Sequence, residues 1–214
     1  MKLSAKKFQQ AYTDNSLKIA FVGMSNIGKS FTASRLAEAF EFKLIEVDKL
    51  IWNRLGHDTM DEFAAWQGHP FEEGYAERES LSIEMENHAT LSAVNSAKGN
   101  TILDTTGSVI YIDPENIRRL KEEFYVVHIK AEPSDMERLK FDYYDNPKPL
   151  IWHRQYRPKP GLSDSENILA CYPKLLMSRA KEYAVMADKT VTSQFVLNPD
   201  LTDEELFAAL KPSR

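Results

Sequence analysis

The sequence predicts an α/β fold in three layers, with a parallel sheet of about five strands flanked by helices. Two features of the 214-residue chain support this prediction. Short apolar, β-rich runs alternate with helical stretches along most of its length, and the first such run leads directly into a glycine-rich loop. The length suits one domain, with or without a lid, and is sufficient for a hydrophobic core.

The glycine-rich loop is the most informative stretch. Residues 23–30 read G-M-S-N-I-G-K-S, which fits the phosphate-binding pattern G-x-x-x-x-G-K-[ST]. An apolar run over 17–22 precedes the loop, and a helical face follows it. The apolar residues of that face are Ala33, Leu36, Ala37 and Phe40. A strand, loop and helix in this order are what the phosphate-binding mechanism requires, whereas a chance glycine-rich turn needs neither flank.

Each residue type in the loop has a physical role. Glycine lets the backbone turn so that its N–H groups face phosphate oxygens, and the helix N-terminus adds a partial positive charge. In such loops the lysine reaches the β- and γ-phosphates and the following hydroxyl ligates Mg²⁺. We therefore expect ATP and Mg²⁺ as cofactors. The expected nucleotide contacts are Gly23, Ser25, Asn26, Ile27, Gly28, Lys29, Ser30 and Phe31.

Bulk composition excludes several classes of function. The net charge of −5 argues against broad nucleic-acid or anionic-membrane binding. A single cysteine, Cys171, excludes an internal disulfide and suits a reducing compartment. The first residues contain no apolar signal core, and no run is long enough to span a bilayer. The sequence therefore predicts a cytoplasmic protein, and it leaves the oligomeric state open.

The remaining elements are predicted in chain order. Residues 1–16 read as a polar N-terminal extension with a helix over 5–12, and 17–214 as a single domain. Further strands are expected over 42–47, 101–104, 124–129 and 190–197. Helices are expected over 29–40, 49–55, 59–67, 71–97, 114–122 and 134–140, and the apolar face of the long one is expected to carry Leu81, Met85, Ala89 and Ser92.

The last third of the chain contains the predicted lid. Residues 142–163 form an irregular polar stretch rich in proline, and a loop of this length in a compact domain is typically functional or disordered. A capping box, Ser163-x-x-Glu166, opens the next helical region, which Pro173 is expected to interrupt or restart. A second capping box at Thr202-x-x-Glu205 opens the final helix.

Three polar stretches follow successive strands of the predicted sheet. They are the loop at 23–30, Asp48, and the segment Asp104–Gly107. Because parallel strands joined by right-handed crossovers end at one edge of a sheet, we expect these stretches to meet there.

The carboxylates at this edge are candidates for phosphoryl-transfer chemistry. Asp48 is placed to orient an acceptor hydroxyl or take its proton, although an N-cap role is compatible with that position. Asp104 ends an apolar strand as a Walker B aspartate does, so a place near Mg²⁺ competes with a turn-forming role. Glu46 is either a ligand of metal-bound water or a solvated carboxylate.

Basic side chains provide candidates for binding anionic groups. Arg179 lies on the apolar stripe of its helix, so it either extends along that stripe to water or points into the cleft toward an anion. The cations of the lid are suited to closing over the phosphates, and the alternative for each is a basic surface loop. They are Lys148, Arg154, Arg157 and Lys159.

Over nearly the whole chain after residue 16, these motifs resemble the shikimate kinase family. The matching segments after the phosphate loop are Glu46-Val47-Asp48 with Gly56, Tyr75 with Glu79, Thr105-Thr106-Gly107, Lys148-Pro149-Leu150-Ile151, and Ser178-Arg179-Ala180-Lys181-Glu182-Tyr183. The resemblance implies a P-loop kinase fold with a lid. It also implies that Asp48 orients the acceptor hydroxyl, that Arg179 binds an acceptor carboxylate, and that Lys148 acts from the lid.

The resemblance further implies an acceptor loop at Thr105, Thr106 and Gly107, where the family has three glycines. The chain departs from the family pattern at two more positions, because Ala76 replaces a substrate-binding arginine and Lys148 replaces the lid arginine. Residues 152–161 lengthen the lid. Losing a bidentate arginine and adding bulk to the acceptor loop are each expected to weaken shikimate binding.

The sequence therefore predicts an ATP-dependent phosphotransferase that acts on a hydroxyl of a small metabolite, either neutral or anionic. Catalytic roles are expected for Lys29, Asp48, Lys148 and Arg179, and metal contacts for Ser30, Glu46 and Asp104. Two alternatives remain open at this point. One is a non-catalytic nucleotide-binding regulator with the same fold, and the other is a nucleoside or nucleotide kinase.

Overall fold

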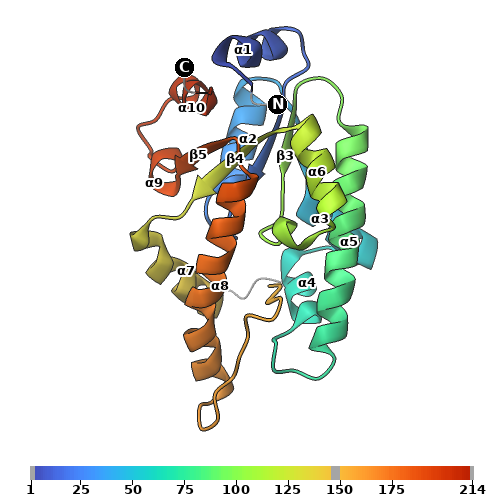
Figure 1. The fold of residues 1–214 in the computed structure, drawn as a ribbon, viewed down its shortest axis with the longest axis vertical. Coiled ribbons are helices and arrows are strands. Elements are labelled where there is room, and N and C mark those ends of the chain that lie inside the picture. The colour runs from blue at the N-terminus through green and yellow to red at the C-terminus, as the bar shows by residue number, and fades with distance from the viewer. Residues whose placement is uncertain (1–2, 146–149, 213–214) are drawn as a thin grey trace.

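The computed structural model describes residues 3–145 and 150–212 and has the predicted α/β fold (Figure 1). Five parallel strands form one sheet in the order β2-β3-β1-β4-β5. They are β1 (Lys18–Val22), β2 (Lys43–Glu46), β3 (Thr101–Asp104), β4 (Tyr125–Lys130) and β5 (Lys189–Thr192). The central strand β1 is almost wholly buried, as expected of a parallel strand covered on both faces.

Helices cover both faces of the sheet. The helices are α1 (Ala5–Thr13), α2 (Lys29–Ala39), α3 (Val47–Leu55), α4 (Met60–Gln67), α5 (Tyr75–Ser96), η1 (Val109–Tyr111), α6 (Pro114–Glu123), α7 (Pro133–Asp145), α8 (Asp164–Met186), α9 (Ser193–Val196) and α10 (Asp203–Leu210). In Figure 1, α5, α6 and α8 lie in front of the sheet, and α2 lies behind it. This arrangement gives the three layers that the sequence predicts.

Strand register aligns the carboxyl ends at one edge. Phe21 of β1 pairs with Asp104 of β3, and Asp104 pairs with Glu46 of β2. These three paired residues form one row across the sheet. Within two residues of that row begin the phosphate loop, α3 and the segment after β3. The predicted meeting of these three stretches is confirmed.

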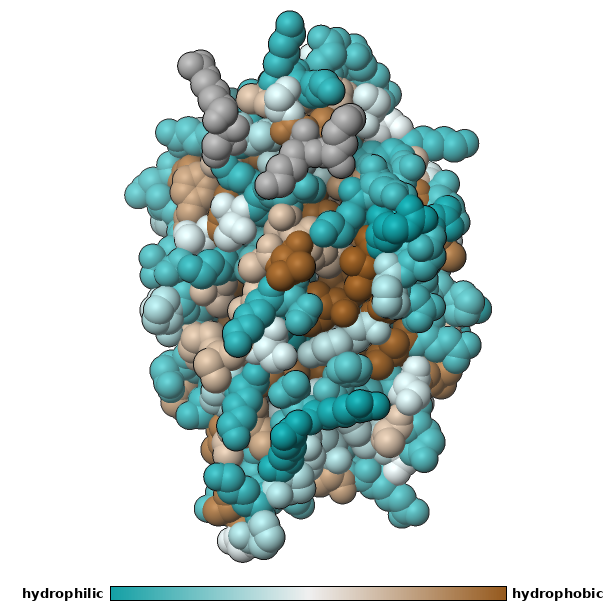
Figure 2. Space-filling model, in the orientation of Figure 1, coloured by the Kyte–Doolittle hydropathy of each residue, from teal (hydrophilic) through white to brown (hydrophobic). Residues whose placement is uncertain are grey.

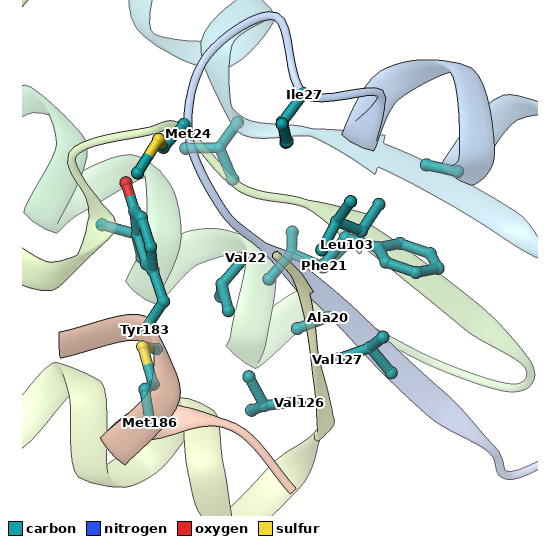
Figure 3. Packing of buried hydrophobic residues seen from close by; sticks show 14 of the residues in the cluster. Ala20, Phe21, Val22, Met24, Ile27, Leu103, Val126, Val127, Tyr183 and Met186 are labelled. Carbon is teal, nitrogen blue, oxygen red and sulfur yellow. The ribbon is translucent and has the colours of Figure 1, made fainter. Parts of the chain in front are cut away.

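The core surrounds the central strands (Figure 3). Tyr183 and Met186 of α8 lie beside β1 and β4, and the hydroxyl of Tyr183 points toward Met24 at the edge that carries the phosphate loop. His128 is buried in β4 beside the Tyr183 ring, and burial lowers the pKa of His128 to about 4. The imidazole is therefore neutral at pH 7, as expected of a structural histidine.

The expected helix over 5–12 is present as α1, and it joins the same core. Phe8 is fully buried, and its ring packs on Tyr125 and Phe207. Tyr12 stacks on Phe42. The polar appearance of residues 1–16 therefore reflects the outer face of an amphipathic helix.

Three local predictions are wrong. Pro173 does not interrupt the helical region, because α8 runs unbroken from Asp164 to Met186 with the proline inside it. The last strand ends at Thr192, and the rest of the predicted strand is α9, which Thr192 caps by accepting a bond from the N–H of Phe195. Helix α7 extends to Asp145, so the irregular stretch is shorter than 142–163. Both predicted capping boxes are present.

The face of the molecule seen in Figure 2 is largely hydrophilic, with hydrophobic residues gathered near its middle. Within the described ranges, none of the helices combines the length and apolarity needed to cross a bilayer.

Candidate active site

The phosphate loop lies between β1 and α2, as its sequence pattern requires. Gly23 has φ +152°, and a Cβ built on it would lie 2.7 Å from the carbonyl oxygen of Ile129. A side chain at this position would therefore collide with the neighbouring strand. Gly28 is the N-cap of α2, Ile27 is buried in the core, and Phe31 is 54% exposed.

Lys29 is the buried cation of this loop. It is 7% exposed, and its Nζ donates to the carbonyl oxygen of Met24 at 3.0 Å. Burial lowers the pKa of Lys29, while the carboxylates of Asp104 and Asp48 oppose that change. An ammonium held this way faces the cavity with N–H donors left for an anionic ligand.

Asp104 and Ser30 provide oxygen atoms suited to a hard cation. Asp104 is buried, and burial raises the pKa of its carboxyl, against the nearby charge of Lys29 and a hydrogen bond from Ser30. One carboxyl oxygen, Oδ1, is buried with no hydrogen-bond partner in the described part of the chain. An unpartnered carboxylate oxygen beside a hydroxyl fits Mg²⁺, which takes few protein ligands and keeps several waters. Glu46 is half-buried, and it accepts a hydrogen bond from Lys49 at 2.5 Å.

One cavity adjoins the phosphate loop. The residues that line it are Ser25, Asn26, Lys29, Ser30, Asp48, Ile51, Met60, Phe63, Gln67, Ser82, Glu86, Thr106, Gly107, Ser108, Ile151 and Arg179. Asp48 lies in the first turn of α3 and is therefore not its N-cap, which is Glu46. The cavity brings together four predicted positions distant in sequence: Lys29, Asp48, Thr106–Gly107 and Arg179.

The segment after β3 has a more specific geometry than the sequence indicates. Thr105 is buried, and its hydroxyl donates to the carbonyl oxygen of Phe21 at 2.7 Å. Its side chain therefore fixes the loop to β1 and does not line the cavity. Thr106 lines the cavity and donates to the carboxylate of Glu86. The predicted acceptor loop is thus held by side-chain hydrogen bonds at both threonines.

Arg179 points inward from α8, so the interpretation that it extends to water is wrong. Only 2% of the residue is exposed. Its Nη1 donates to the carbonyl oxygen of Gly107 at 2.9 Å, and its Nη2 donates to that of Ile151 at 2.6 Å. Its Nε has no partner within the described residues, and the guanidinium carbon lies 5.4 Å from the Tyr111 ring centroid. Arg179 therefore joins the acceptor loop to the segment after the lid while lining the cavity.

The structure describes three of the four predicted lid cations. Lys148 lies outside the described residues. Arg154, Arg157 and Lys159 are exposed, and none of the three lines the cavity. Glu79 holds residues 152–153 of this stretch. Its Oε1 accepts hydrogen bonds from the backbone N–H groups of Trp152 at 2.5 Å and His153 at 3.1 Å.

The sequence-based reasoning missed Glu86, Gln67 and Ser82. The fully buried residues of α5 include Ser82, Glu86, Ala89 and Thr90, so Ala89 of the expected stripe is confirmed, Leu81 and Met85 are half-buried, and Ser92 is exposed. The buried polar residues Ser82, Glu86 and Thr90 each lie one position after a residue of the expected stripe, which was chosen for its apolar side chains. The signal that was available is Ser82-x-x-x-Glu86-x-x-x-Thr90, a polar i, i+4 series inside a long helix.

Arg138 of α7 was also missed. Its Nη1 donates to the carbonyl oxygen of Asn26 in the phosphate loop at 3.1 Å, and its side chain is 40% exposed. It therefore places a partly solvated cation at the outer side of that loop.

Ala76, where the sequence departs from the family's arginine, is exposed and does not line the cavity. The nearby Arg78 donates to the backbone carbonyl oxygens of Gln67 and Glu73.

The described geometry agrees with comparisons to known proteins. A family model described as shikimate kinase matches residues 25–196. The chain belongs to the shikimate kinase family. A shikimate kinase of Xylella fastidiosa (strain M23) is 28% identical over 193 residues, which are 90% of this chain and 91% of the relative. One from Xanthomonas oryzae pv. oryzae (strain PXO99A) is 28% identical over 125 residues, which are 58% of this chain and 62% of the relative.

Solved structures of this family share the fold. Shikimate kinase from Acinetobacter baumannii, in complex with shikimate, superposes with a TM-score of 0.57 at 21% identity and covers 85% of this chain and 86% of its own. Shikimate kinase from Aquifex aeolicus gives a TM-score of 0.53 at 18% identity, covering 91% of this chain and 96% of its own. At these identities the likeness establishes the α/β fold, and family membership supports a kinase-like phosphotransferase.

Proposed function

We propose that this protein transfers the γ-phosphate of ATP to a hydroxyl group of a small metabolite. The observation that supports this most directly is the shared cavity, in which a buried phosphate-loop lysine, Lys29, faces Asp48 and Arg179. Phosphoryl transfer needs a cation at the phosphates, a group that orients the acceptor hydroxyl, and an acceptor held in line with the leaving oxygen. These three residues provide one candidate for each requirement.

In this proposal, Lys29 and the backbone of residues 23–30 hold the β- and γ-phosphates. Asp48 orients the acceptor hydroxyl and takes up its proton as the new P–O bond forms and the bond from the γ-phosphorus to the β–γ bridging oxygen breaks. Arg179 binds an anionic group of the acceptor, and its buried Nε, which has no hydrogen-bond partner within the described residues, supports this role. Lys148 is proposed to act from the lid.

Ser30 and Asp104 are proposed to hold Mg²⁺, directly or through water, with Glu46 at the outer edge. The ion, when bound, neutralises charge on the phosphate oxygens as transfer proceeds. The single cysteine and the acidic net charge support a cytoplasmic location and a small-molecule acceptor in preference to nucleic acid.

The acceptor is proposed to be a hydroxylated metabolite related to shikimate. The family and the shikimate complex of the Acinetobacter baumannii enzyme support this class. The exposed Ala76, at the position of the family's substrate-binding arginine, and the threonines of the acceptor loop argue for an acceptor other than shikimate.

The test is ADP release from Mg²⁺-ATP, with and without shikimate and with a panel of hydroxylated carboxylic acids. Lys29→Met should lower acceptor-stimulated ADP release at least 100-fold, because it removes the buried phosphate-binding cation. Asp48→Ala should lower it by a similar factor with ATP affinity preserved. Lys98→Met, which changes an exposed lysine beyond α5, should have no effect.

Three other results would count against the proposal. ATP binding without ADP release for any acceptor would favour the non-catalytic regulator. Stimulation only by nucleosides would favour a nucleoside or nucleotide kinase. Full transfer by Lys29→Met would refute the assigned phosphate-binding role.

A further inference from the structure

One aromatic ring joins the cavity arginine to the lid insertion, the stretch of residues 152–161 that lengthens the lid. The ring of Tyr111 contacts the guanidinium of Arg179 and stacks on the imidazole of His153. We propose that Tyr111 and His153 are positioning residues, which hold Arg179 in the orientation that binds the acceptor. The inference rests on the proposed function, in which Arg179 binds an anionic group of that acceptor.

Hydrogen bonds alone do not fix the plane of the Arg179 guanidinium. Its Nη1 and Nη2 donate to the carbonyl oxygens of Gly107 and Ile151, which fixes two points of a planar group. A plane held at two points can still rotate about the line through them, and this rotation changes the direction of the Nε–H. That N–H has no hydrogen-bond partner within residues 3–145 and 150–212. A third contact is therefore needed to set where it points.

Tyr111 provides that third contact. The guanidinium carbon of Arg179 lies 5.4 Å from the centroid of the Tyr111 ring, within the range of a cation–π interaction. Tyr111 is half-buried at the end of η1, and the buried Val109 anchors the same turn in the core. Tyr111 does not line the cavity, so it acts on an acceptor through Arg179.

His153 holds the Tyr111 ring from the lid insertion. The two ring centroids are 4.4 Å apart and the ring planes differ by 20°, which is a stacked arrangement. His153 (φ +42°) and Arg154 (φ +67°) both have left-handed backbone conformations, which residues other than glycine adopt only where neighbouring contacts offset the cost. The contacts at this turn include the stack on Tyr111 and the hydrogen bond from the His153 N–H to Glu79.

The contacts therefore run from the lid insertion through Tyr111 to Arg179. His153 is exposed and, like Tyr111, does not line the cavity. Replacing its side chain should leave the fold intact while loosening the guanidinium. The role of both residues can thus be tested without changing the lining of the cavity.

The direct test observes the Nε–H of Arg179 by proton–nitrogen NMR, with no acceptor present. The resonance is assigned by its disappearance in Arg179→Lys, and the measured quantity is the rate at which this proton exchanges with water. The backbone amide of Ala20, in the buried central strand, is the internal reference. General loosening of the fold accelerates both protons, whereas loss of a positioning contact accelerates only the one on Arg179.

Two substitutions and their conservative counterparts are compared. Tyr111→Leu should accelerate exchange at Arg179 about fivefold or more, and His153→Ala about threefold, because each removes part of the aromatic contact. Tyr111→Phe and His153→Phe retain a ring and should stay within about twofold of the wild type. His88→Ala, which changes an exposed histidine of α5, is the matched control and should behave as the wild type does.

A kinetic measurement tests the effect on the acceptor. ADP release from Mg²⁺-ATP is measured with shikimate and the panel of hydroxylated carboxylic acids. For any acceptor that stimulates release, its KM in Tyr111→Leu should rise about fivefold, with the KM for ATP unchanged and kcat changed by less than about twofold. Tyr111→Phe should restore the wild-type KM.

Several results would overturn the assignment. They are unchanged exchange in both Tyr111→Leu and His153→Ala, equal acceleration at Arg179 and Ala20 in both variants, and an unchanged acceptor KM in Tyr111→Leu. Expected exchange rates with no acceptor-stimulated ADP release would contradict the proposed transfer while supporting the positioning of Arg179. Transfer with unchanged exchange in both variants would support the kinase function and refute the positioning role.

Discussion

Arg179 and Gly107 are 72 residues apart in sequence, and they are joined by a buried hydrogen bond of 2.9 Å between the guanidinium and the backbone carbonyl. The same carbonyl accepts a hydrogen bond from the hydroxyl of Tyr183, one turn further along α8. Two side chains of one helix thus hold the loop that lines the cavity.

Arg179→Lys is expected to weaken both the fold and acceptor binding. Lysine cannot donate to the carbonyl oxygens of Gly107 and Ile151 in the forked geometry of a guanidinium. Each lost hydrogen bond from a charged donor costs about 1.5–3 kcal/mol. Acceptor KM should rise about tenfold or more, and thermal unfolding should occur at a lower temperature. Lys181→Met, an exposed change on the same helix, serves as the control.

Gly107→Ala is expected to disturb the phosphate loop through the acceptor loop. A Cβ on Gly107 would lie 2.8 Å from Oγ of Ser25 and 3.1 Å from its backbone nitrogen. Because the second contact involves backbone, the loop itself must shift. ATP affinity should fall together with acceptor affinity, which isothermal titration measures separately. A loss confined to the acceptor would contradict this close approach.

Glu86 is expected to make a contribution to stability that falls as pH rises from about 4.5 to 7. Its pKa is about 7 in the folded state against 4.5 for an ordinary glutamate, so the folded state holds the proton more tightly. Burial raises this pKa; Asp48 raises it further, while Ser108, Thr106 and Arg179 lower it. By linkage, the penalty is absent below pH 4.5 and reaches roughly 3 kcal/mol above pH 7.

Urea unfolding of wild type and Glu86→Gln across this pH range checks the prediction. The stability of the wild type relative to Glu86→Gln should fall as pH rises, because the difference between the two proteins cancels groups common to both, including His128, whose lowered pKa acts in the opposite direction. Parallel pH profiles for the two proteins would show that Glu86 is not the group responsible.

Phe8→Ala is expected to destabilise the whole domain and not only the first helix. The ring is fully buried against Tyr125 of β4 and Phe207 of α10, and removing such a ring costs about 3–5 kcal/mol. Phe141→Ala, where the phenylalanine is 63% exposed, should change stability by about 0.5 kcal/mol or less. Equal losses in the two variants would argue that residues 1–16 contribute nothing to the core.

The sequence was sufficient to predict the sheet and the phosphate loop because their signals are local. A buried strand, a glycine pattern and a helix follow one another within 24 residues, and the strand ends Phe21, Glu46 and Asp104 meet because parallel topology leaves them no other edge. Pro173 misled the prediction of α8, since a proline costs one hydrogen bond and tertiary packing of the buried helix face offsets that cost.

The wall of the cavity was not predictable in the same way. Glu86 reads as one more charged residue on a long polar helix, and only its contact with Thr106, 20 residues away, distinguishes it from the exposed Glu84. Thr105 and Thr106 are adjacent in sequence, yet one binds the backbone of β1 and the other reaches α5. Such differences depend on which way each side chain leaves the loop.

The hydrogen bond from Arg179 to Ile151 is one of the contacts that hold the segment after the lid, together with those from Trp152 and His153 to Glu79. Breaking one charge-assisted bond of this kind costs about 1.5–3 kcal/mol, which corresponds to a detached population lower by roughly 10- to 150-fold at 25 °C. A ligand carboxylate that competes for the same guanidinium would relieve part of that cost. Arg179 therefore couples occupancy of the acceptor cavity to the position of Ile151.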